Sequence, residues 1–600
     1  MCGIFGYVGQ KTNGADKVLH GLKQLEYRGY DSWGVAVAAE MEFNPRTQST
    51  SPTQIVVEKH VGKIGDAELS VANIKSSLAI GHTRWATHGG VTVENAHPHL
   101  DTHHQIAVVH NGIIENFQEL KAELLAKGYH FLSETDSEVF TLLVEEELKS
   151  FGLRDAVQRV FQRLHGLNAF VVLSPADQQL VVVRKGSPLA LGKADDGFYV
   201  ASDASAMALY ANKVFYLDDN QIAVLSNDRA ELFDAKTLEE KDAVWQPLDF
   251  QAEDLSKGEF PHYLIKEIHE QPRVLSTIAN ELLPQVEQFT QHLDGRPLFV
   301  GCGTAYHASL SGLYFWQIIA KKSASAIQGS EFRYTRDVLT QRDFVTFISQ
   351  SGETIDIVEH LPLLNERKIP FGAIVNRLGS SLERGSVHKV LLPAGAEQCV
   401  LATKSYTAMV AVLFLLAHAM AGTLVEGQRQ LLTAVKQLEH VLKPEFRANH
   451  ILPVAQMLAK AIHIFLIGRG NSYPIALEAA LKIKEVTYVH TEGFAGGELK
   501  HGVIALIEIG TPCIVFAPEG EEYEATISNA LELKVRGATI IGVSSKPSDA
   551  FDHFLPVDSV AELSTLTHAV VIQQLAYEMA LILGNDPDKP RNLAKSVTVK

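Results

Sequence analysis

Short apolar runs separated by polar turns dominate the first 220 residues. LAIGHT (78–83), QIAVVHNG (105–112) and QLVVVRKG (179–186) have the length and composition of buried strands. The segment FQELKAELLAKG (117–128) instead repeats its apolar residues at helical spacing. This mixture predicts an α+β domain over residues 1–220.

The remainder of the chain contains an internal duplication. PLFVGCGTAYH begins at residue 297 and IFLIGRGNSY at residue 464, so that Gly301, Gly303 and Tyr306 recur 167 positions later. Each copy reads as an apolar strand, a glycine turn and a helix, which is how a parallel α/β layer begins. We therefore expect two fused α/β domains with parallel sheets, the first at 286–430 and the second at 455–590. A linker at 221–285 would precede them, and a tail at 591–600 would follow.

One segment has the composition of a membrane span. AMVAVLFLLAHAMAGTLV (408–425) has only His418 as a strongly polar residue and reaches spanning length. A helix buried on all sides of a large α/β domain has the same composition. Because a plausible globular domain surrounds this single segment, we expect a buried helix and no membrane.

Charge and cysteine content narrow the function. The net charge is −17 and no basic face stands out, which argues against nucleic acid as a partner. The four cysteines, Cys2, Cys302, Cys399 and Cys513, form no paired spacing. With no signal peptide in view, we expect a reducing, cytoplasmic location.

The first duplicated copy carries a candidate phosphate loop. FVTFI (344–348) is followed by Ser349-Gln350-Ser351-Gly352-Glu353-Thr354 at the start of a helix. Hydroxyls and backbone N–H groups at a helix N-terminus can hold a phosphate, although an ordinary helix cap has the same residues. The second copy has PEGEE (518–522) at the matching place, and its acids would repel a phosphate.

Polar clusters interrupt the apolar runs of the first domain, and each also has a structural interpretation. Asn111-Gly112 is a strong turn signal, and Thr135 with Glu138 fits a helix capping box. The histidines lack the spacing of a known metal site, so we expect no metal and no cofactor; they are His97, His99, His103 and His104.

Cys2 gives these clusters a chemical meaning. If Met1 is removed, Cys2 carries a thiol and an α-amine whose reference pKa values are about 8.5 and about 7.7–8.0. A neutral fraction of the amine can take the thiol proton near neutral pH, which makes a nucleophile with its own base. An Asn side chain beside a Gly N–H suits an oxyanion. Arg and Asp can hold the carboxylate and ammonium of an amino acid.

Specific motifs then carry a resemblance that covers the whole chain. The first half resembles the glutaminase domain of N-terminal-nucleophile amidotransferases, with sandwiched antiparallel sheets, and the duplicated half is similar to paired sugar isomerase (SIS) domains. Together they resemble the family of isomerising glutamine–fructose-6-phosphate aminotransferases. The motifs are CGIFG, EYRGYDS, HTRWATHG, NAHPH, HNGIIEN, SETDSE, KEIHEQP, SQSGET, ELKHG and PRNLAKSVTV.

The resemblance implies that L-glutamine and D-fructose 6-phosphate give D-glucosamine 6-phosphate and L-glutamate, the first step of the hexosamine pathway. Cys2 would attack the glutamine amide and Asn111 with Gly112 would form the oxyanion hole. Arg84 would bind the glutamine carboxylate, Asp136 its amine, and Trp85 would gate ammonia passage. The remaining implied binding residues are Thr87, His88 and Gly89 for glutamine, and Thr304, Ser349, Gln350, Ser351, Thr354 and Lys482 for the sugar phosphate.

The isomerisation is assigned in the same way. Moving a carbonyl from C2 to C1 needs a base, which fits Glu485, and ring opening needs an acid–base group, which fits His501. In this family His501 comes from a neighbouring subunit, which implies a homodimer through the SIS domains. Lys595 would form a Schiff base with the ketose, although by itself it reads as a solvated tail lysine.

The chain departs from the family pattern at two positions and lacks the motifs of rival families. Serines are common in the family where this chain has Ala305 and Ala402, so we expect altered sugar contacts. Purine-type amidotransferases need a phosphoribosyl-diphosphate loop and asparagine synthetases a pyrophosphate loop such as SGGxDS, and the chain has neither. A SIS-based sugar-phosphate regulator would explain SQSGET but not the nucleophile at position 2.

Overall fold

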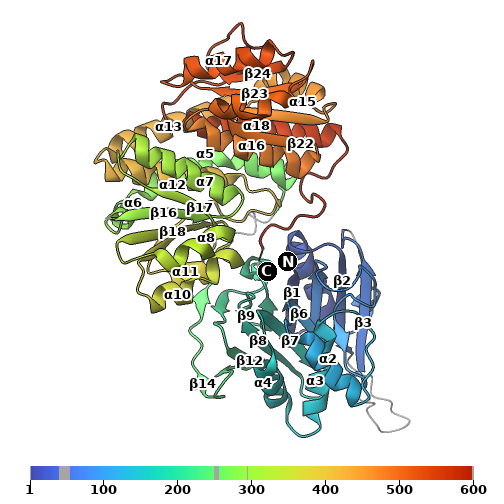
Figure 1. Ribbon diagram of the computed structural model, residues 1–600. Coiled ribbons are helices and arrows are strands. Elements are labelled where there is room, and N and C mark those ends of the chain that lie inside the picture. Colours follow the sequence, from blue (N-terminus) through green and yellow to red (C-terminus); the bar gives the residue numbers. More distant parts are fainter. Residues whose placement is uncertain (1, 40–53, 66, 249–255, 294, 598–600) are drawn as a thin grey trace. The chain divides into compact units, whose positions relative to one another are not determined.

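The computed structural model describes residues 2–39, 54–65, 67–248, 256–293 and 295–597. Met1, whose removal bears on Cys2, lies outside them. The chain forms two compact units (Figure 1), one of residues 1–256 with the tail from Ala594, the other of Lys257–Leu593. Each is described by itself.

The N-terminal unit contains two antiparallel sheets that face each other. In hydrogen-bonded order, the first contains β15 (Gln246–Pro247), β11 (Lys213–Tyr216), β9 (Ala190–Ala194), β10 (Gly197–Ala201), β1 (Gly3–Gly9), β4 (Leu78–Arg84), β2 (Ser32–Ala39) and β3 (Gln54–Val61). The second contains β14 (Glu240–Lys241), β13 (Ala230–Asp234), β12 (Gln221–Leu225), β8 (Gln179–Lys185), β7 (Asn168–Ser174), β6 (Ala107–Gly112) and β5 (His99–Leu100).

Alternation along the strands builds the layers of this unit. On β1, Ile4 and Val8 point into the core between the sheets, whereas Phe5 and Tyr7 point to the outer face. Helix α1 (Gly14–Leu25) covers that outer face. The other sheet is covered by α2 (Phe117–Ala126), α3 (Ser137–Leu148) and α4 (Leu153–Arg163), whose apolar side chains share one core with it.

The second unit contains two parallel sheets with the same strand order. In hydrogen-bonded order, one sheet contains β17 (Ser325–Gln328), β16 (Arg296–Gly301), β18 (Asp343–Ser349), β19 (Phe371–Val375) and β20 (His388–Leu391). The other sheet contains β22 (His490–Ala495), β21 (His463–Gly468), β23 (Pro512–Ala517), β24 (Thr539–Ser544) and β25 (His553–Pro556). Because the duplicated motifs start at β16 and β21, the matching order reproduces the duplication read from the sequence. Antiparallel sheets followed by two parallel α/β domains confirm the expected fold class.

One hydrophobic core joins the two α/β domains. Its longer helices are α5 (Tyr263–Glu281), α6 (Leu283–Thr290), α7 (Thr304–Ile318), α12 (Lys404–Met420), α13 (Leu424–Val441), α16 (Ser472–Thr487) and α18 (Ser564–Ile582), while α17 (Tyr523–Lys534) lies on the far face of the last sheet. The shorter helices are α8 (Phe332–Thr335), α9 (Ile355–Val358), α10 (Leu361–Glu366), α11 (Ser381–Gly385), α14 (Pro444–Phe446) and α15 (Leu452–Leu458).

Two stretches bear on the sequence expectations. Helix α12 is buried along nearly its whole length, which confirms the buried-helix interpretation of the apolar segment. Across the described residues, no helix combines the length and apolarity that membrane crossing requires. The stretch expected as a linker, 221–285, contains strands β12 to β15 of the first unit and helix α5 of the second.

Candidate functional site

The candidate nucleophile lies where β1 begins and its neighbouring strand β4 ends. Cys2 precedes β1, and Trp85 directly follows the antiparallel strand β4. The Trp85 N–H donates to the Cys2 Sγ at 3.2 Å, and the thiol lies 3.6 Å from the Trp85 carbonyl oxygen. A backbone donor at this distance stabilises a thiolate more than a thiol, which favours nucleophilic attack.

The backbone of Cys2 is held from two sides. Its carbonyl oxygen accepts hydrogen bonds from Arg28 Nε at 3.1 Å and from Asn111 Nδ2 at 3.0 Å. Arg28 lies in the EYRGYDS motif and is buried beside Asp203. These two donors fix the position of the nucleophile relative to Asn111, although Asn111 is on β6 of the other sheet.

The backbone conformation at position 112 requires a glycine. Its φ is 136°, and a Cβ there would overlap the carbonyl oxygen of Leu167. No larger residue fits this conformation and this contact. The structure therefore brings the expected oxyanion pair, Asn111 and Gly112, to the nucleophile.

Arg84 is buried, and its guanidinium holds the loop that follows β4. It donates to the carbonyl oxygens of Gly90 at 3.0 Å and Gly89 at 3.3 Å, and also to that of His88. Burial lowers the pKa of Arg84, and the negative groups Cys2, Asp31 and Asp136 oppose that shift. Arg84 thus lies within electrostatic reach of both the nucleophile and Asp136.

The segment before α3 carries Asp136. Its Oδ2 accepts from the backbone N–H of Ile114 at 2.7 Å, which places it just beyond Gly112. The same segment contacts the Arg84 loop, because Glu134 accepts from Asn95 Nδ2 at 3.1 Å and from Gly90 N–H at 3.1 Å. Thr87 is exposed, and His88 packs its ring against Phe117. The two segments expected to bind glutamine are therefore joined.

The candidate phosphate loop is ordered by its own hydroxyls. Ser349 Oγ lies 3.0 Å from Thr354 Oγ1 and accepts from Gly352 N–H at 3.0 Å, while Ser351 Oγ accepts from Glu353 N–H at 3.2 Å. Gln350 lies in the same loop. Because β16 and β18 are parallel neighbours, this loop and Thr304 extend from the same edge of one sheet.

A buried charge cluster joins α7 to α16. Lys482, 1% exposed, lies 2.7 Å from Glu485 and 3.4 Å from Glu478, and it donates to Thr304 Oγ1 at 3.0 Å. Burial alone would lower the pKa of Lys482, but the two carboxylates outweigh it and the pKa is raised. The lysine therefore stays charged. The Glu485 side chain keeps 17% exposure, so that a ligand can reach it.

Sequence reasoning missed two members of this cluster. Glu478, 1% exposed, accepts from Thr304 Oγ1 at 3.2 Å and pairs with His307 Nδ1 at 2.7 Å. The spacing of Glu478 and Lys482, four positions apart on one helix, was the available signal. His307 is part of the quoted turn but carried no pattern of its own. In the N-terminal unit, the EYRGYDS motif contains Arg28 and Asp31, but the sequence alone indicated no role for either residue.

One expected residue of the second unit is not brought to the cluster. His501 ends a 3-10 helix at Gly496–His501 and is exposed, with no hydrogen bond or ion pair to Glu485 within the part of the chain that the structure describes. Lys595 belongs to the tail that groups with the first unit. Their assigned roles remain predictions.

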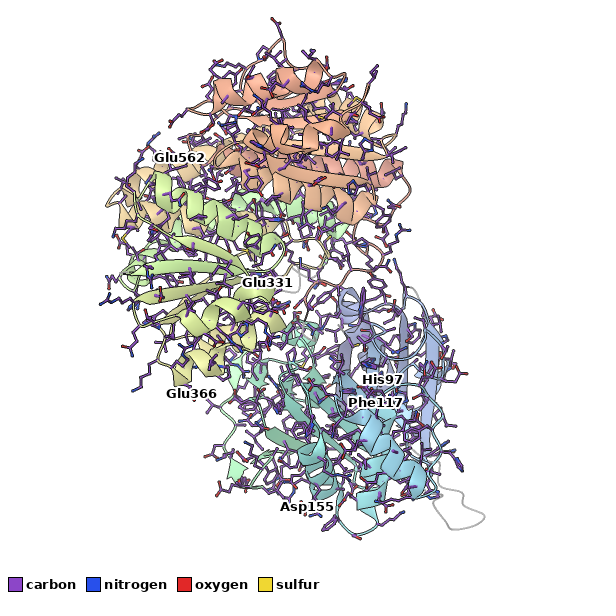
Figure 2. The ribbon with its side chains drawn as sticks, viewed as in Figure 1. His97, Phe117, Asp155, Glu331, Glu366 and Glu562 are labelled. Atoms are coloured by element: carbon purple, nitrogen blue, oxygen red, sulfur yellow. The ribbon has the colours of Figure 1, made fainter. Side chains whose placement is uncertain are left out.

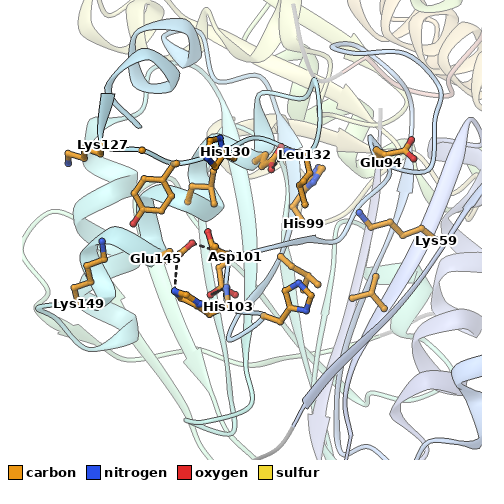
Figure 3. Close-up of a pocket in the computed structure, with 18 of the residues that line it drawn as sticks. Lys59, Glu94, His99, Asp101, His103, Lys127, His130, Leu132, Glu145 and Lys149 are labelled. Carbon is orange, nitrogen blue, oxygen red and sulfur yellow. Dashed lines mark hydrogen bonds and ion pairs between the residues drawn. The ribbon is translucent and has the colours of Figure 1, made fainter. Parts of the chain in front are cut away.

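A pocket of about 720 Å³ lies elsewhere in the N-terminal unit (Figure 3). Lys59 of β3, His99 of β5 and Glu145 of α3 are on its walls, and among the described residues none of the expected glutamine-binding residues lines it. His99 Nε2 lies 3.1 Å from Thr135 Oγ1, which connects this pocket to the segment that carries Asp136.

Known proteins resemble the chain in both halves. The SIS domain family matches residues 294–419 and 457–583, and the glutamine amidotransferase domain family matches residues 82–209. A protein of Methanothermobacter thermautotrophicus and one of Pyrococcus horikoshii, both named glutamine–fructose-6-phosphate aminotransferase [isomerizing], are each 39% identical to it across 100% of both chains. The chain belongs to this aminotransferase family. The resemblance inferred from the motifs is thereby confirmed.

A solved structure supports the same assignment for the second unit. The C-terminal domain of glucosamine-fructose-6-phosphate aminotransferase from Francisella tularensis is 29% identical, with a TM-score of 0.50. It covers 56% of this chain and 99% of its own. Cys2 belongs to the first unit, whereas Lys482 and Glu485 belong to the second.

Proposed function

We propose that this chain converts L-glutamine and D-fructose 6-phosphate into L-glutamate and D-glucosamine 6-phosphate. The observation that carries the proposal is the 39% identity to relatives of that name across the full length of both chains. Water consumed when glutamine is hydrolysed is returned when ammonia condenses with the ketose, so that the amide nitrogen is the net transferred group.

The glutamine half-reaction uses the site at Cys2. The thiolate bonds to the amide carbon, and the carbonyl oxygen takes negative charge beside Asn111 Nδ2 and Gly112 N–H. The nitrogen of the tetrahedral intermediate gains the proton that the Cys2 α-amine took from the thiol, and ammonia leaves. The resulting thioester is hydrolysed by water to glutamate. Arg84 and Asp136 hold the carboxylate and ammonium of the substrate, and Trp85 gates ammonia passage. The Trp85 N–H at 3.2 Å from Sγ supports this arrangement.

The sugar half-reaction uses the second unit. The phosphate is held by Ser349, Gln350, Ser351 and Thr354, with Thr304 and Lys482 nearby. Lys595 forms a Schiff base with the open-chain ketose before ammonia takes its place. Glu485 then removes the proton from C1 and returns it to C2, which moves the carbonyl to C1. The position of Glu485, 2.7 Å from Lys482 and with 17% of its side chain exposed, supports this role.

The same family membership supports two further assignments. His501 opens the sugar ring from a neighbouring subunit, so that the working form is a homodimer through the SIS domains. The exposure of His501 on its own chain is consistent with use by a partner. We place the enzyme in the cytoplasm, where its free cysteines would stay reduced.

One labelling experiment tests the overall reaction. The protein is incubated with amide-¹⁵N glutamine and fructose 6-phosphate, and the products are analysed by mass spectrometry. We expect the label in an amino sugar phosphate. Label found only in free ammonia, with the sugar phosphate present in excess, would contradict the proposal.

A further inference from the structure

His82 connects the two sheets beside the candidate nucleophile. It lies on β4, opposite Ile4 of β1 on one side and Gly34 of β2 on the other, and it is fully buried. Its side chain reaches β6 in the other sheet. There, Nε2 lies 2.9 Å from the carbonyl oxygen of His110 and 3.1 Å from Asn111 Oδ1.

These two contacts determine the tautomer of His82. A carbonyl oxygen only accepts hydrogen bonds, so Nε2 carries the proton and donates it. Burial lowers the pKa of His82 to about 3, so the ring is neutral at physiological pH and has this single N–H. Across the described residues, Nδ1 has no hydrogen-bond partner, consistent with the unprotonated nitrogen.

The tautomer in turn orients the Asn111 carboxamide. An N–H on His82 requires Oδ1, and not the NH₂ group, to face the imidazole. Asn111 Nδ2 is thereby turned to Cys2, whose carbonyl oxygen lies 3.0 Å away. That nitrogen has two hydrogens, and one bond to Cys2 leaves the second for a substrate oxygen. If the amide were reversed, its oxygen would face the developing oxyanion and repel it.

We propose that His82 is a positioning residue for glutamine hydrolysis, which keeps Asn111 oriented as an oxyanion donor. The inference rests on the proposed glutaminase role of Asn111. A neighbouring ring supplies the control: His97, labelled in Figure 2, packs on His82 with centroids 4.1 Å apart, but no nitrogen of His97 has a hydrogen-bond partner among the described residues. His97 therefore shares the packing of His82 without its hydrogen bond to Asn111.

The test compares H82F, H82Q and H97F. Loss of a whole oxyanion donor lowers kcat by about 10²–10³, so we expect H82F, which only frees the donor to rotate, to lower kcat for glutamine hydrolysis about 10- to 100-fold. KM should change little, because the substrate-binding groups remain. H82Q, which offers an amide N–H, should recover most of the loss, and H97F should stay close to the parent. Interconversion of fructose and glucose 6-phosphates should be unchanged in all three.

A double-variant cycle with N111A separates positioning from packing. H82F/N111A should be no slower than N111A alone, because His82 acts through Asn111. Multiplying effects, or a loss in H97F equal to that in H82F, would overturn the proposal. Full activity of N111A would instead remove the Asn111 assignment on which the proposal rests.

A measurement on the parent protein covers the case in which H82F does not fold. With ¹⁵N-labelled histidine, the ring signals absent from H82Q belong to His82. We expect a protonated Nε2 and an unprotonated Nδ1. The opposite tautomer would overturn the proposal without any activity assay.

Discussion

Gly112 allows a sharp test of the oxyanion site. Gly112→Ala should abolish glutamine hydrolysis, because its Cβ would overlap the Leu167 carbonyl and displace the donor N–H. The matched control is Gly128→Ala, where φ is also positive but no atom lies within 4 Å of an added Cβ. We expect that control to cost about 1–2 kcal/mol of stability and to keep its activity. Equal activity loss in both variants would show that backbone strain alone is responsible.

The charge of Lys482 should be essential to the second unit. Lys482→Met would remove the buried cation that Glu478 and Glu485 share, and breaking a buried ion pair in this way costs about 3–5 kcal/mol. Lys484→Met, on the exposed face of the same helix, is the control. Thermal unfolding should show a clear loss for the first variant and almost none for the second. Equal melting temperatures would contradict the role that the cluster gives to Lys482.

Residue chemistry was predictable to different degrees. Cys2 and Asn111 could be proposed as members of one site from the chain alone, since each has a distinctive type and position, and the structure places them in contact. The bonds of Arg84 to the loop carbonyls and of Asp136 to Ile114 N–H could not, because they depend on where loops close in space. Arg28 is the clearest omission: its motif was visible, but its bond to the Cys2 carbonyl was not.

Strands β4, β5 and β6, with the segment just before β5, place four buried histidines together, and these should control acid stability; they are His82, His97, His99 and His110. Burial is the main cause that lowers the pKa of each histidine, and it lowers that of His82 to about 3. The positive charge of Arg84 lowers the pKa of His82, His97 and His99 further. Among the four, only His110 has its shift opposed by Asp136. Unfolding restores a pKa of about 6.5, so the unfolded chain binds more protons below that pH.

The sign of the effect follows directly. The stability that comes from keeping these histidines neutral is fully present above about pH 6.5. It is lost as the pH falls toward the lower pKa values of the folded state. Four groups give up to about 5 kcal/mol per pH unit in that window. Tryptophan fluorescence should report the acid unfolding of the first unit, because that unit contains Trp33, Trp85 and Trp245, whereas Trp316 is in the second unit.

A single substitution checks the proton count. His97→Leu removes one titrating group that has no hydrogen bond among the described residues, and it should make the pH dependence of unfolding shallower by about one proton. Unfolding free energies at several pH values between 4 and 7 measure this slope. An unchanged slope would show that His97 is protonated in the folded state.

The duplicated turns show why the elements of the second unit were readable. A Cβ at Gly301 would meet the backbone of Ala305, and one at Gly468 would overlap that of Ser472, so both copies need glycine where the helix packs back on its strand. That requirement left a visible repeat. The strands from residue 221 onward left none: they are short, β14 and β15 are exposed strands of two residues each, and β15 pairs with β11, which is distant in sequence. Composition alone therefore suggested a linker.

The two half-reactions should separate at the level of the complete chain. Cys2→Ala should abolish glutamine hydrolysis while fructose and glucose 6-phosphates still interconvert, because the charge cluster lies in the other unit. Glu485→Gln should give the converse result. Loss of both activities in either folded variant would argue against independent sites.

Lys595 poses the last question, since a tail lysine is ordinarily a solvated group. If it forms a Schiff base with the open-chain ketose, borohydride should reduce that imine to a stable amine and attach the sugar phosphate to the chain. Peptide mapping of the full-length protein, treated with fructose 6-phosphate and borohydride, should place the added mass on Lys595. The neighbouring Lys589 is an internal control in the same digest. Lys595→Met should lose both the label and the isomerisation while glutamine hydrolysis persists, and label elsewhere in the parent protein would reject the assignment.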